Sequence, residues 1–482
     1  MAIILIWEND PGAGGFAIAD QPDIKKPPFK FGFPLPALLP SLDTTTEEFR
    51  YWIAAEALRR GADFWGPKVT ARPAWYCGTE LEVRLDVGPR WDANYERLAL
   101  NFFHGVLSSG VNIYAAASGD MLCHELGHAM LDAIQDRLWH TVYKEVDAFH
   151  ESFGDVSAIL CALQIPTMRR SILTYTGPNL YRDSKLSRIA EQFGAGLHAQ
   201  DPAEAYPNCL RNAWNSFYYV RPDLLPGWAH ITQLSSERHS FSRIFTGALF
   251  EILAGMLTVH AANSLAPTPA ELLDVTMDMR DIMAAAVVSA PIDTGYYALV
   301  AAEMVLASET KNPAYPAVFC TAFVGRLILS LASASAIMEM LTTGPNAGAR
   351  RAPTRSRTAN IKPGHQSYTP VFSPLPSERF GLGEDLYVEM PADAVDSSAR
   401  SATREGDSIE PLNSEAAATL FVAELFALGL VDTDADRDDD DGKKNEERVL
   451  ERTTHRLKRV GKQLRLIRIR ISCRSEHACS WA

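Results

Sequence analysis

The sequence lacks several features that would place it in a common class of protein. Its 482 residues include only seven cysteines, which are odd in number, scattered, and without zinc-finger spacing. Such a pattern is typical of reduced thiols in the cytosol. The formal net charge of −13 disfavours a general nucleic-acid binder. We therefore expect a cytoplasmic protein and no nucleic-acid partner.

Signals for export and membrane insertion are also missing. Residues 1–7 are apolar but carry no basic region, and Glu8 and Asp10 follow at once, so we expect a short strand there and not a signal peptide. Residues 317–341 are the best candidate for a membrane span, but they include Arg326 and Glu339. We predict a buried helix over this stretch and no membrane partner.

The most informative motif that is present is His124-Glu125-Leu126-Gly127-His128. On a helix, residues four apart share a face, so the two histidines can present their imidazole nitrogens to one tetrahedral ion, with Glu125 beside it. This HExxH arrangement is typical of zinc hydrolases. Catalytic zinc normally takes three protein ligands and leaves the fourth position for water, so a third ligand is required.

The third ligand is not supplied by the metzincin pattern, because Leu131 and Ile134 stand where that pattern has Gly and His. Residues 149–163 instead carry an apolar stripe at helical spacing, and Glu151 and Asp155 share another face of that helix. Glu151 suits the third ligand, and Asp155 suits the carboxylate that holds a ligating histidine by its other ring nitrogen. We predict one Zn²⁺ per chain.

Together these motifs resemble those of the gluzincin peptidases of the thermolysin-like type, where a Glu with an Asp four residues later follows HExxH on the next long helix. Glu151 lies 23 positions after His128 (151 − 128), a few more than is usual in that family, and His150 replaces the usual Asn. A longer connection between the two helices would accommodate the difference.

Three further segments resemble the same family. Residues 239–250 resemble the segment in which a histidine precedes a helix and donates to the tetrahedral oxyanion, which implies that role for His239. Asp120 stands four residues before His124, as an Asp does in the family. Residues 92–95 are loosely similar to the family's substrate-binding edge segment.

The resemblance implies a zinc-dependent endopeptidase that cuts a peptide or protein substrate, with Glu125 taking a proton from the metal-activated water. Aminopeptidases of this type generally carry a GxMEN segment upstream of the zinc helix, and this sequence has none. The alternative is a noncatalytic binding or assembly protein on a retained zinc-peptidase scaffold. The two hypotheses differ in whether Glu125 is needed for function.

The implied fold is α+β and two-lobed, with a β-containing N-terminal lobe, a mainly helical C-terminal lobe and a C-terminal extension. A hydrophobic content of 47% is enough for two or three domains. We also predict a helix over residues 44–62 and a strand over 80–87. The predicted divisions are an N-terminal wrap and helix (1–63), a β-containing lobe with the zinc helices (64–165), a helical lobe (166–342), a linker (343–414) and a small C-terminal module (415–482).

The C-terminal extension combines an acidic run with a basic segment. The acids from Asp432 to Asp441 have a rhythm like that of a Ca²⁺ loop, but lack the Gly and the Glu that an EF-hand loop needs, so we favour a solvated acidic loop. We predict strands over 385–390 and 467–471, a helix over 415–430 and a turn over 460–462. The basic face of the last strand could bind an acidic partner or a nucleic acid, and we favour pairing with the chain's own acids.

Overall fold

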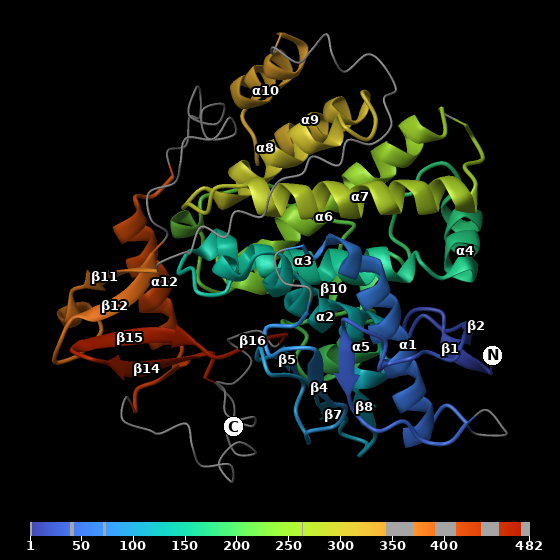
Figure 1. Ribbon diagram of the computed structural model, residues 1–482, viewed down its shortest axis with the longest axis horizontal. Coiled ribbons are helices and arrows are strands. Elements are labelled where there is room, and N and C mark those ends of the chain that lie inside the picture. The colour runs from blue at the N-terminus through green and yellow to red at the C-terminus, as the bar shows by residue number, and fades with distance from the viewer. Residues whose placement is uncertain are drawn as a thin grey trace.

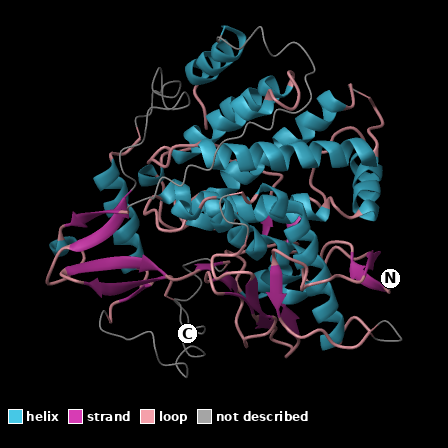
Figure 2. Ribbon diagram, viewed as in Figure 1, coloured by secondary structure: helices cyan, strands magenta, loops and turns pink. Residues whose placement is uncertain are grey.

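The computed structural model describes residues 2–38, 43–70, 74–262, 264–343, 370–390, 411–434 and 453–473. The fold is mixed α+β, as predicted, with several small sheets. Figure 2 shows most helices stacked in one part of the molecule, with strands below them and in a separate C-terminal sheet. Buried apolar side chains from Ile4 to Leu341, together with Ala417, Ile471 and Cys473, form one continuous core, and the C-terminal sheet has a smaller core that Val142 joins.

The N-terminal region begins with the predicted strand. β1 (Ile3–Trp7) pairs antiparallel with β2 (Phe16–Asp20). α1 (Glu47–Trp65) begins after Thr46, whose side chain accepts a hydrogen bond from the Phe49 amide and so satisfies one of the amides left free at the helix start. The predicted helix is therefore confirmed, with both ends three residues later than expected.

A five-stranded sheet lies beside the helix that carries the HExxH motif. Its strands, in spatial order, are β16 (Ile471–Ser472), β5 (Ala93–Tyr95), β6 (Ala99–Phe102), β4 (Glu80–Arg84) and β3 (Lys30–Gly32). β5 runs antiparallel to both of its neighbours. The predicted strand over 80–87 is confirmed but ends at Arg84. β16 comes from the far end of the sequence, and it covers what would otherwise be the edge strand of the sheet (Figure 1).

Three helices form the centre of the molecule. α2 (Gly119–Ile134) carries the HExxH motif, α3 (Lys144–Ala162) carries Glu151 and Asp155, and α6 (Arg238–His260) packs against α3. α2 and α3 approach closely at Gly127, where an added Cβ would lie 2.8 Å from the Ser157 hydroxyl oxygen. The missing side chain thus allows the two metal-motif helices to pack at backbone distance.

The remaining described elements surround this centre. They are β7 (His104–Val106), β8 (Asn112–Tyr114), α4 (Pro166–Thr176), β9 (Arg188–Ile189), α5 (Glu191–Gln200), β10 (Arg211–Asn212), α7 (Pro269–Ser289), α8 (Tyr296–Ser308), α9 (Tyr315–Gly325) and α10 (Leu331–Thr343).

The single helix predicted over 317–341 is wrong, because the segment is two helices, α9 and α10. The chain turns between them at Leu327, whose φ is 57°, while the Arg326 guanidinium donates to the carbonyls of Asn215 and Phe217. Among the described helices, α6 is the one whose length and composition would allow it to cross a membrane. That stretch is 78% buried inside the protein, as expected for a core helix.

The C-terminal module is a second five-stranded sheet with one helix. The strands lie in the order β11 (Val371–Leu375), β12 (Leu386–Met390), β15 (Gln463–Arg468), β14 (His455–Val460) and β13 (Val431–Asp432), and the helix is α12 (Ser414–Ala427). The predicted turn at 460–462 joins β14 to β15 and is confirmed. The strand predicted over 467–471 is wrong as one element, because β15 ends at Arg468 and β16 joins the other sheet.

β11 and β12 fall inside the segment predicted as a linker, so the module begins before residue 415. The rest of that segment, 344–369 and 391–410, lies outside the described residues, as does the acidic run from 435 onward with its calcium hypothesis.

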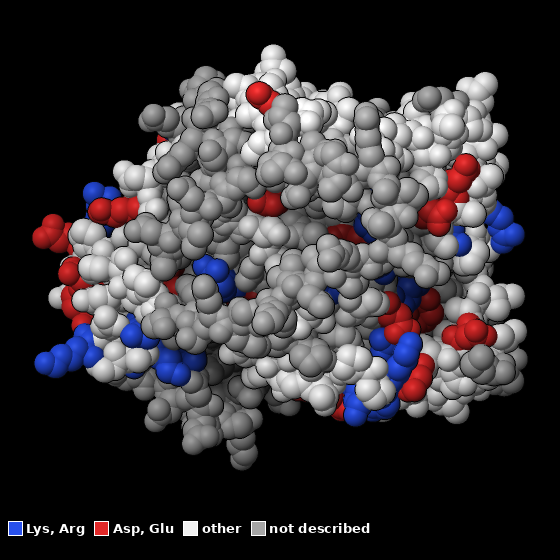
Figure 3. Space-filling view, turned by 45° about the horizontal axis from the view of Figure 1, so that its top comes forward, with Lys and Arg blue, Asp and Glu red and all other residues white. Residues whose placement is uncertain are grey.

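The module is docked against the start of α3 by ion pairs. Arg468, which is 5% exposed, pairs with Asp147, and Lys144 pairs with Glu424 of α12. The basic residues of the last strand therefore include one that is buried against an acid of the metal-motif helix. On the face drawn in Figure 3, the basic and acidic side chains of the described residues lie in mixed groups.

Candidate metal centre

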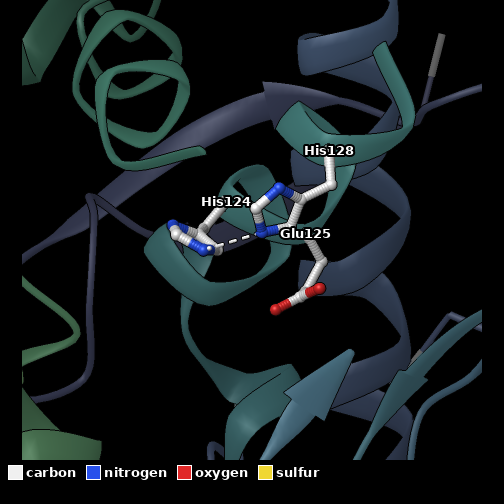
Figure 4. Close-up of side chains that lie close together, drawn as sticks. All are labelled: His124, Glu125 and His128. Carbon is white, nitrogen blue, oxygen red and sulfur yellow. Dashed lines mark hydrogen bonds between the residues drawn. The ribbon is translucent and has the colours of Figure 1, made fainter. Parts of the chain in front are cut away.

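The two histidines of α2 converge as their helical spacing predicts. Both are fully buried, and their Nε2 atoms lie 3.1 Å apart (Figure 4). Together with Glu125 they form a group of potential ligand atoms that all lie within 4.8 Å of one another. Two imidazole nitrogens at this separation, away from water, can share one cation.

Glu151 of α3 completes a tighter set than Glu125 does. One of its carboxylate oxygens lies 3.3 Å from Nε2 of His124, and the other lies 3.9 Å from Nε2 of His128. A tetrahedral zinc ion with bonds of 2.0–2.1 Å holds its ligand atoms about 3.3 Å apart. Neither Glu151 oxygen has a hydrogen-bond partner among the described residues, although both are buried. The three residues are therefore arranged so that they could hold a metal ion.

The carboxylate of Asp155 fixes the first of these ligands. Its Oδ1 lies 3.0 Å from Nδ1 of His124, the ring nitrogen that faces away from the other ligands. Arg211 of β10 holds Asp155 in turn, with its Nε and Nη2 atoms 2.8–3.2 Å from the carboxylate oxygens. Burial would raise the pKa of Asp155, but the Arg211 charge outweighs it and the pKa is lowered. Asp155 is therefore an ionised acceptor that orients His124.

Gly154 lets α3 lie against the same imidazole. An added Cβ at Gly154 would lie 2.7 Å from Cε1 of His124 and 3.0 Å from its Nε2. Real side chains do not approach this closely, so any other residue here would push the imidazole away. One face of α3 thus brings three residues against His124: the carboxylates of Glu151 and Asp155, and Gly154, which leaves space for the imidazole.

Glu125, the candidate general base, lies beside His124 and His128. It is fully buried, and burial raises its pKa to about 8, against the opposing charge of His124. Its Oε1 accepts a hydrogen bond from the thiol of Cys473 at 2.6 Å, and its Oε2 has no partner among the described residues. A carboxylate with a pKa near neutrality can both take and return a proton.

His239 reaches the centre from the start of α6. Glu237 caps that helix by accepting from the Ser240 amide, and its other oxygen lies 2.6 Å from Nδ1 of His239. Burial would lower the pKa of His239, but the Glu151 and Glu237 carboxylates raise it above its usual value. Its Nε2 lies 3.3 Å from Glu151 and donates to the carbonyl of Ser472 at 2.9 Å. His239 is thus an oriented donor next to the ligands.

A small cavity lies beside the candidate metal ligands, and strand β5 lies near them. The cavity has a volume of about 50 Å³ and is lined by His239, Arg211 and Cys473 and by apolar side chains that include Trp91 and Phe193. β5 belongs to the segment 92–95 that resembles a substrate-binding edge, and β16 is hydrogen-bonded to it. The fold therefore places a strand-pairing edge next to the candidate metal ligands.

The structure brings together all six residues singled out from the sequence, His124, Glu125, His128, Glu151, Asp155 and His239. The Asp120 carboxylate has other partners. It accepts hydrogen bonds from the Asn9 side chain and the Ala190 amide, and so anchors the start of α2.

Sequence reasoning missed three residues at the centre: Arg211, Arg238 and Cys473. Arg238 lies 3.6 Å from Glu151 and donates to the Ser472 carbonyl, as His239 does. None of the three belongs to a spacing motif, because each meets the site from a separate element. Compared with known proteins, the sequence matches no family model and no curated protein.

Proposed function

We propose that this protein is a zinc-dependent peptidase of the gluzincin type that cuts internal bonds of a peptide or protein substrate. The observation that carries the proposal is the convergence of His124, His128 and Glu151 at near-tetrahedral separations, with Glu125 and His239 beside them. A small sheet beside a helical centre is compatible with a thermolysin-like arrangement, which we retain as part of the proposal.

Each residue of the candidate centre has a separate role in the proposed peptide hydrolysis. His124, His128 and Glu151 would hold the metal, and a bound zinc ion supplies a Lewis acid that lowers the pKa of its water to about 7. Glu125 accepts the proton of the attacking water and later returns it to the leaving amine. His239 donates from Nε2 to the carbonyl oxygen as negative charge develops there.

The substrate would lie along β5 as an added antiparallel strand. Support comes from Cys473 and Ser472, which show how an extended backbone fits there: the Cys473 amide donates to the Ala93 carbonyl at 2.8 Å, and the Ser472 carbonyl accepts from His239. Main-chain pairing of this kind gives affinity without demanding a particular sequence. The adjoining cavity, with Trp91 and Phe193 in its lining, favours a compact apolar side chain.

The test compares Glu125→Gln with Glu151→Ala by metal content and by cleavage of a mixed peptide library, with and without a chelator. Each variant is prepared with and without Cys473→Ala, because Cys473 contacts the base. We expect about one zinc per chain in wild type and in Glu125→Gln, with turnover lowered by about 10²–10⁴-fold in the latter. Glu151→Ala should lose zinc.

Two results would contradict the proposal. Absence of zinc from the wild-type protein after loading would remove the metal centre altogether. Stoichiometric zinc with no cleavage of any library member, even in the Cys473→Ala background, would favour the noncatalytic scaffold instead.

A further inference from the structure

The C-terminal strand β16 is paired with β5, the strand along which the substrate is proposed to lie. Ile471 and Ser472 pair antiparallel with Tyr95 and Asn94 of β5, and the pairing continues through the Cys473 amide to the Ala93 carbonyl. A sheet edge can pair with one strand at a time, so a peptide cannot add to β5 while β16 is there.

The strand is held by groups of the candidate catalytic centre as well as by β5. The Ser472 carbonyl oxygen accepts from Nε2 of His239 at 2.9 Å and from Nη2 of Arg238 at 3.0 Å. The Ser472 hydroxyl donates to Asp92 at 2.7 Å. His239, the donor proposed to polarise a substrate carbonyl, is therefore engaged by a carbonyl of the protein's own chain, together with the neighbouring Arg238.

The Cys473 side chain contacts two residues of the candidate metal centre. Its thiol donates to Oε1 of Glu125 and also interacts with His124, although 348 residues separate Cys473 from Glu125. The side chain is 5% exposed. Buried oxygens of Glu125 and Glu151 that lack hydrogen-bond partners among the described residues lie at the same centre. The thiol thus contacts both the candidate general base and one candidate metal ligand.

The chain connects this strand directly to the C-terminal module. β15 ends at Arg468, whose ion pair with Asp147 fixes the module to α3, and β16 begins three residues later. Arg470, between the two strands, is 3% exposed. The module therefore holds β16 in register with β5, and displacing the module would withdraw the strand.

We propose that β16 and Cys473 form an internal inhibitor that keeps the enzyme latent, with the Cys473 sulfur as the fourth protein ligand of the bound metal. The inference rests on the proposed function. Cys473 would bind the metal as a thiolate, its proton passing to the Glu125 carboxylate that the thiol contacts, and its sulfur would fill the position that a catalytic site leaves open to water. A site with four protein ligands is closed to water.

The size of the effect follows from the tether. A tethered segment acts at an effective concentration on the order of 1 mM. A segment with an intrinsic Kd of about 0.1 mM would then leave about one site in ten open, so its release raises turnover about tenfold. Losing the thiol alone weakens one of several contacts, and we expect at least a severalfold increase in turnover.

The experiment uses the full-length protein loaded with Co²⁺ in place of Zn²⁺, as wild type, Cys473→Ala and Cys473→Ser. Cys320→Ser serves as the matched control, because Cys320 lies on α9 and is partly buried away from the centre. The first readout is the thiolate-to-cobalt charge-transfer band in the near ultraviolet. The second is turnover of a library peptide, and the third is the intact mass after metal loading.

We expect the charge-transfer band in wild type and in Cys320→Ser, its loss in both Cys473 variants, and higher turnover in those variants. Bound cobalt without the band, together with equal turnover in all four proteins, would overturn the inference while leaving the proposed peptidase intact. Cleavage of the chain between Ser472 and Cys473 after loading would also overturn it, because the segment would then be a substrate. Failure to bind cobalt or zinc would instead refute the proposed function.

Discussion

The substitution Asp155→Ala should lower both the metal affinity and the free energy of unfolding, and the two losses have different causes. His124 would lose the acceptor that orients its Nδ1, and losing such a partner typically lowers metal affinity 10–100-fold, or about 1.4–2.8 kcal/mol. Arg211, whose side chain is 4% exposed, would keep its charge without the carboxylate that now faces it. Removing one partner of a buried ion pair, so that the other charge stays buried without it, lowers the free energy of unfolding by about 3–5 kcal/mol.

The two effects can be separated with a second substitution. In Asp155→Ala/Arg211→Met the unpaired charge is gone, so most of the lost free energy of unfolding should return, while metal affinity should stay low because His124 still lacks its acceptor. Asp155→Asn is the matched control, because it keeps the shape and one acceptor oxygen.

Urea unfolding of the metal-free protein measures stability, and competition with a chromophoric chelator measures zinc affinity. The reasoning would be refuted by a zinc affinity for Asp155→Ala within twofold of wild type, since the carboxylate would then have no part in orienting the ligand. Recovery of zinc affinity together with stability in the double variant would show that Asp155 acts only through Arg211.

Three other expectations concern the donor, the helix contact and pH. His239→Asn should lower kcat by about 10²–10³-fold in a Cys473→Ala background while zinc affinity is unchanged, and a fall in zinc content would contradict its role as a donor. Gly154→Ala would place a Cβ 2.7 Å from the His124 ring and should weaken zinc binding. Gly325→Ala is the control, because its added Cβ would have no heavy atom within 4 Å, and it should bind zinc as wild type does. Equal zinc affinities of the two variants would refute the packing argument. Burial raises the pKa of Glu145 from 4.5 to about 7. Between these pH values the Glu145 carboxyl is protonated in the folded, metal-free protein and ionised in the unfolded chain. The free energy of unfolding should therefore fall as pH rises from about 4.5 to 7. Glu145→Gln should flatten this part of a urea-unfolding pH profile, and an unchanged slope would show that Glu145 does not cause it.

Local spacing was enough to predict which side chains of α2 and α3 share a face at the candidate centre. His124, Glu125 and His128 follow from residues four apart on one helix, and Glu151 and Asp155 follow from the same rule on the next helix. His239 was found by its resemblance to a family segment. The other five predictions could be made because each depends on a short stretch of sequence whose helical geometry fixes which side chains share a face.

Predictions that depended on where an element ends or on what it pairs with were less accurate. The break at Arg326 divides one predicted helix into two, because its guanidinium is held by carbonyls of residues about 110 positions away. The predicted last strand divides at Arg468, whose partner Asp147 lies 321 residues earlier. Distant partners of this kind have no periodic signal in the sequence.

The sequence by itself determined which residues are candidates to bind a metal, which carboxylate is the candidate base, and which helices carry them. Only the tertiary structure decided what those residues meet. It placed Arg211 on Asp155, Gly154 under the His124 ring and Cys473 against Glu125. The reason is that a helix sets the spacing of its own side chains through local hydrogen bonds, whereas contacts between distant segments depend on how the whole core packs.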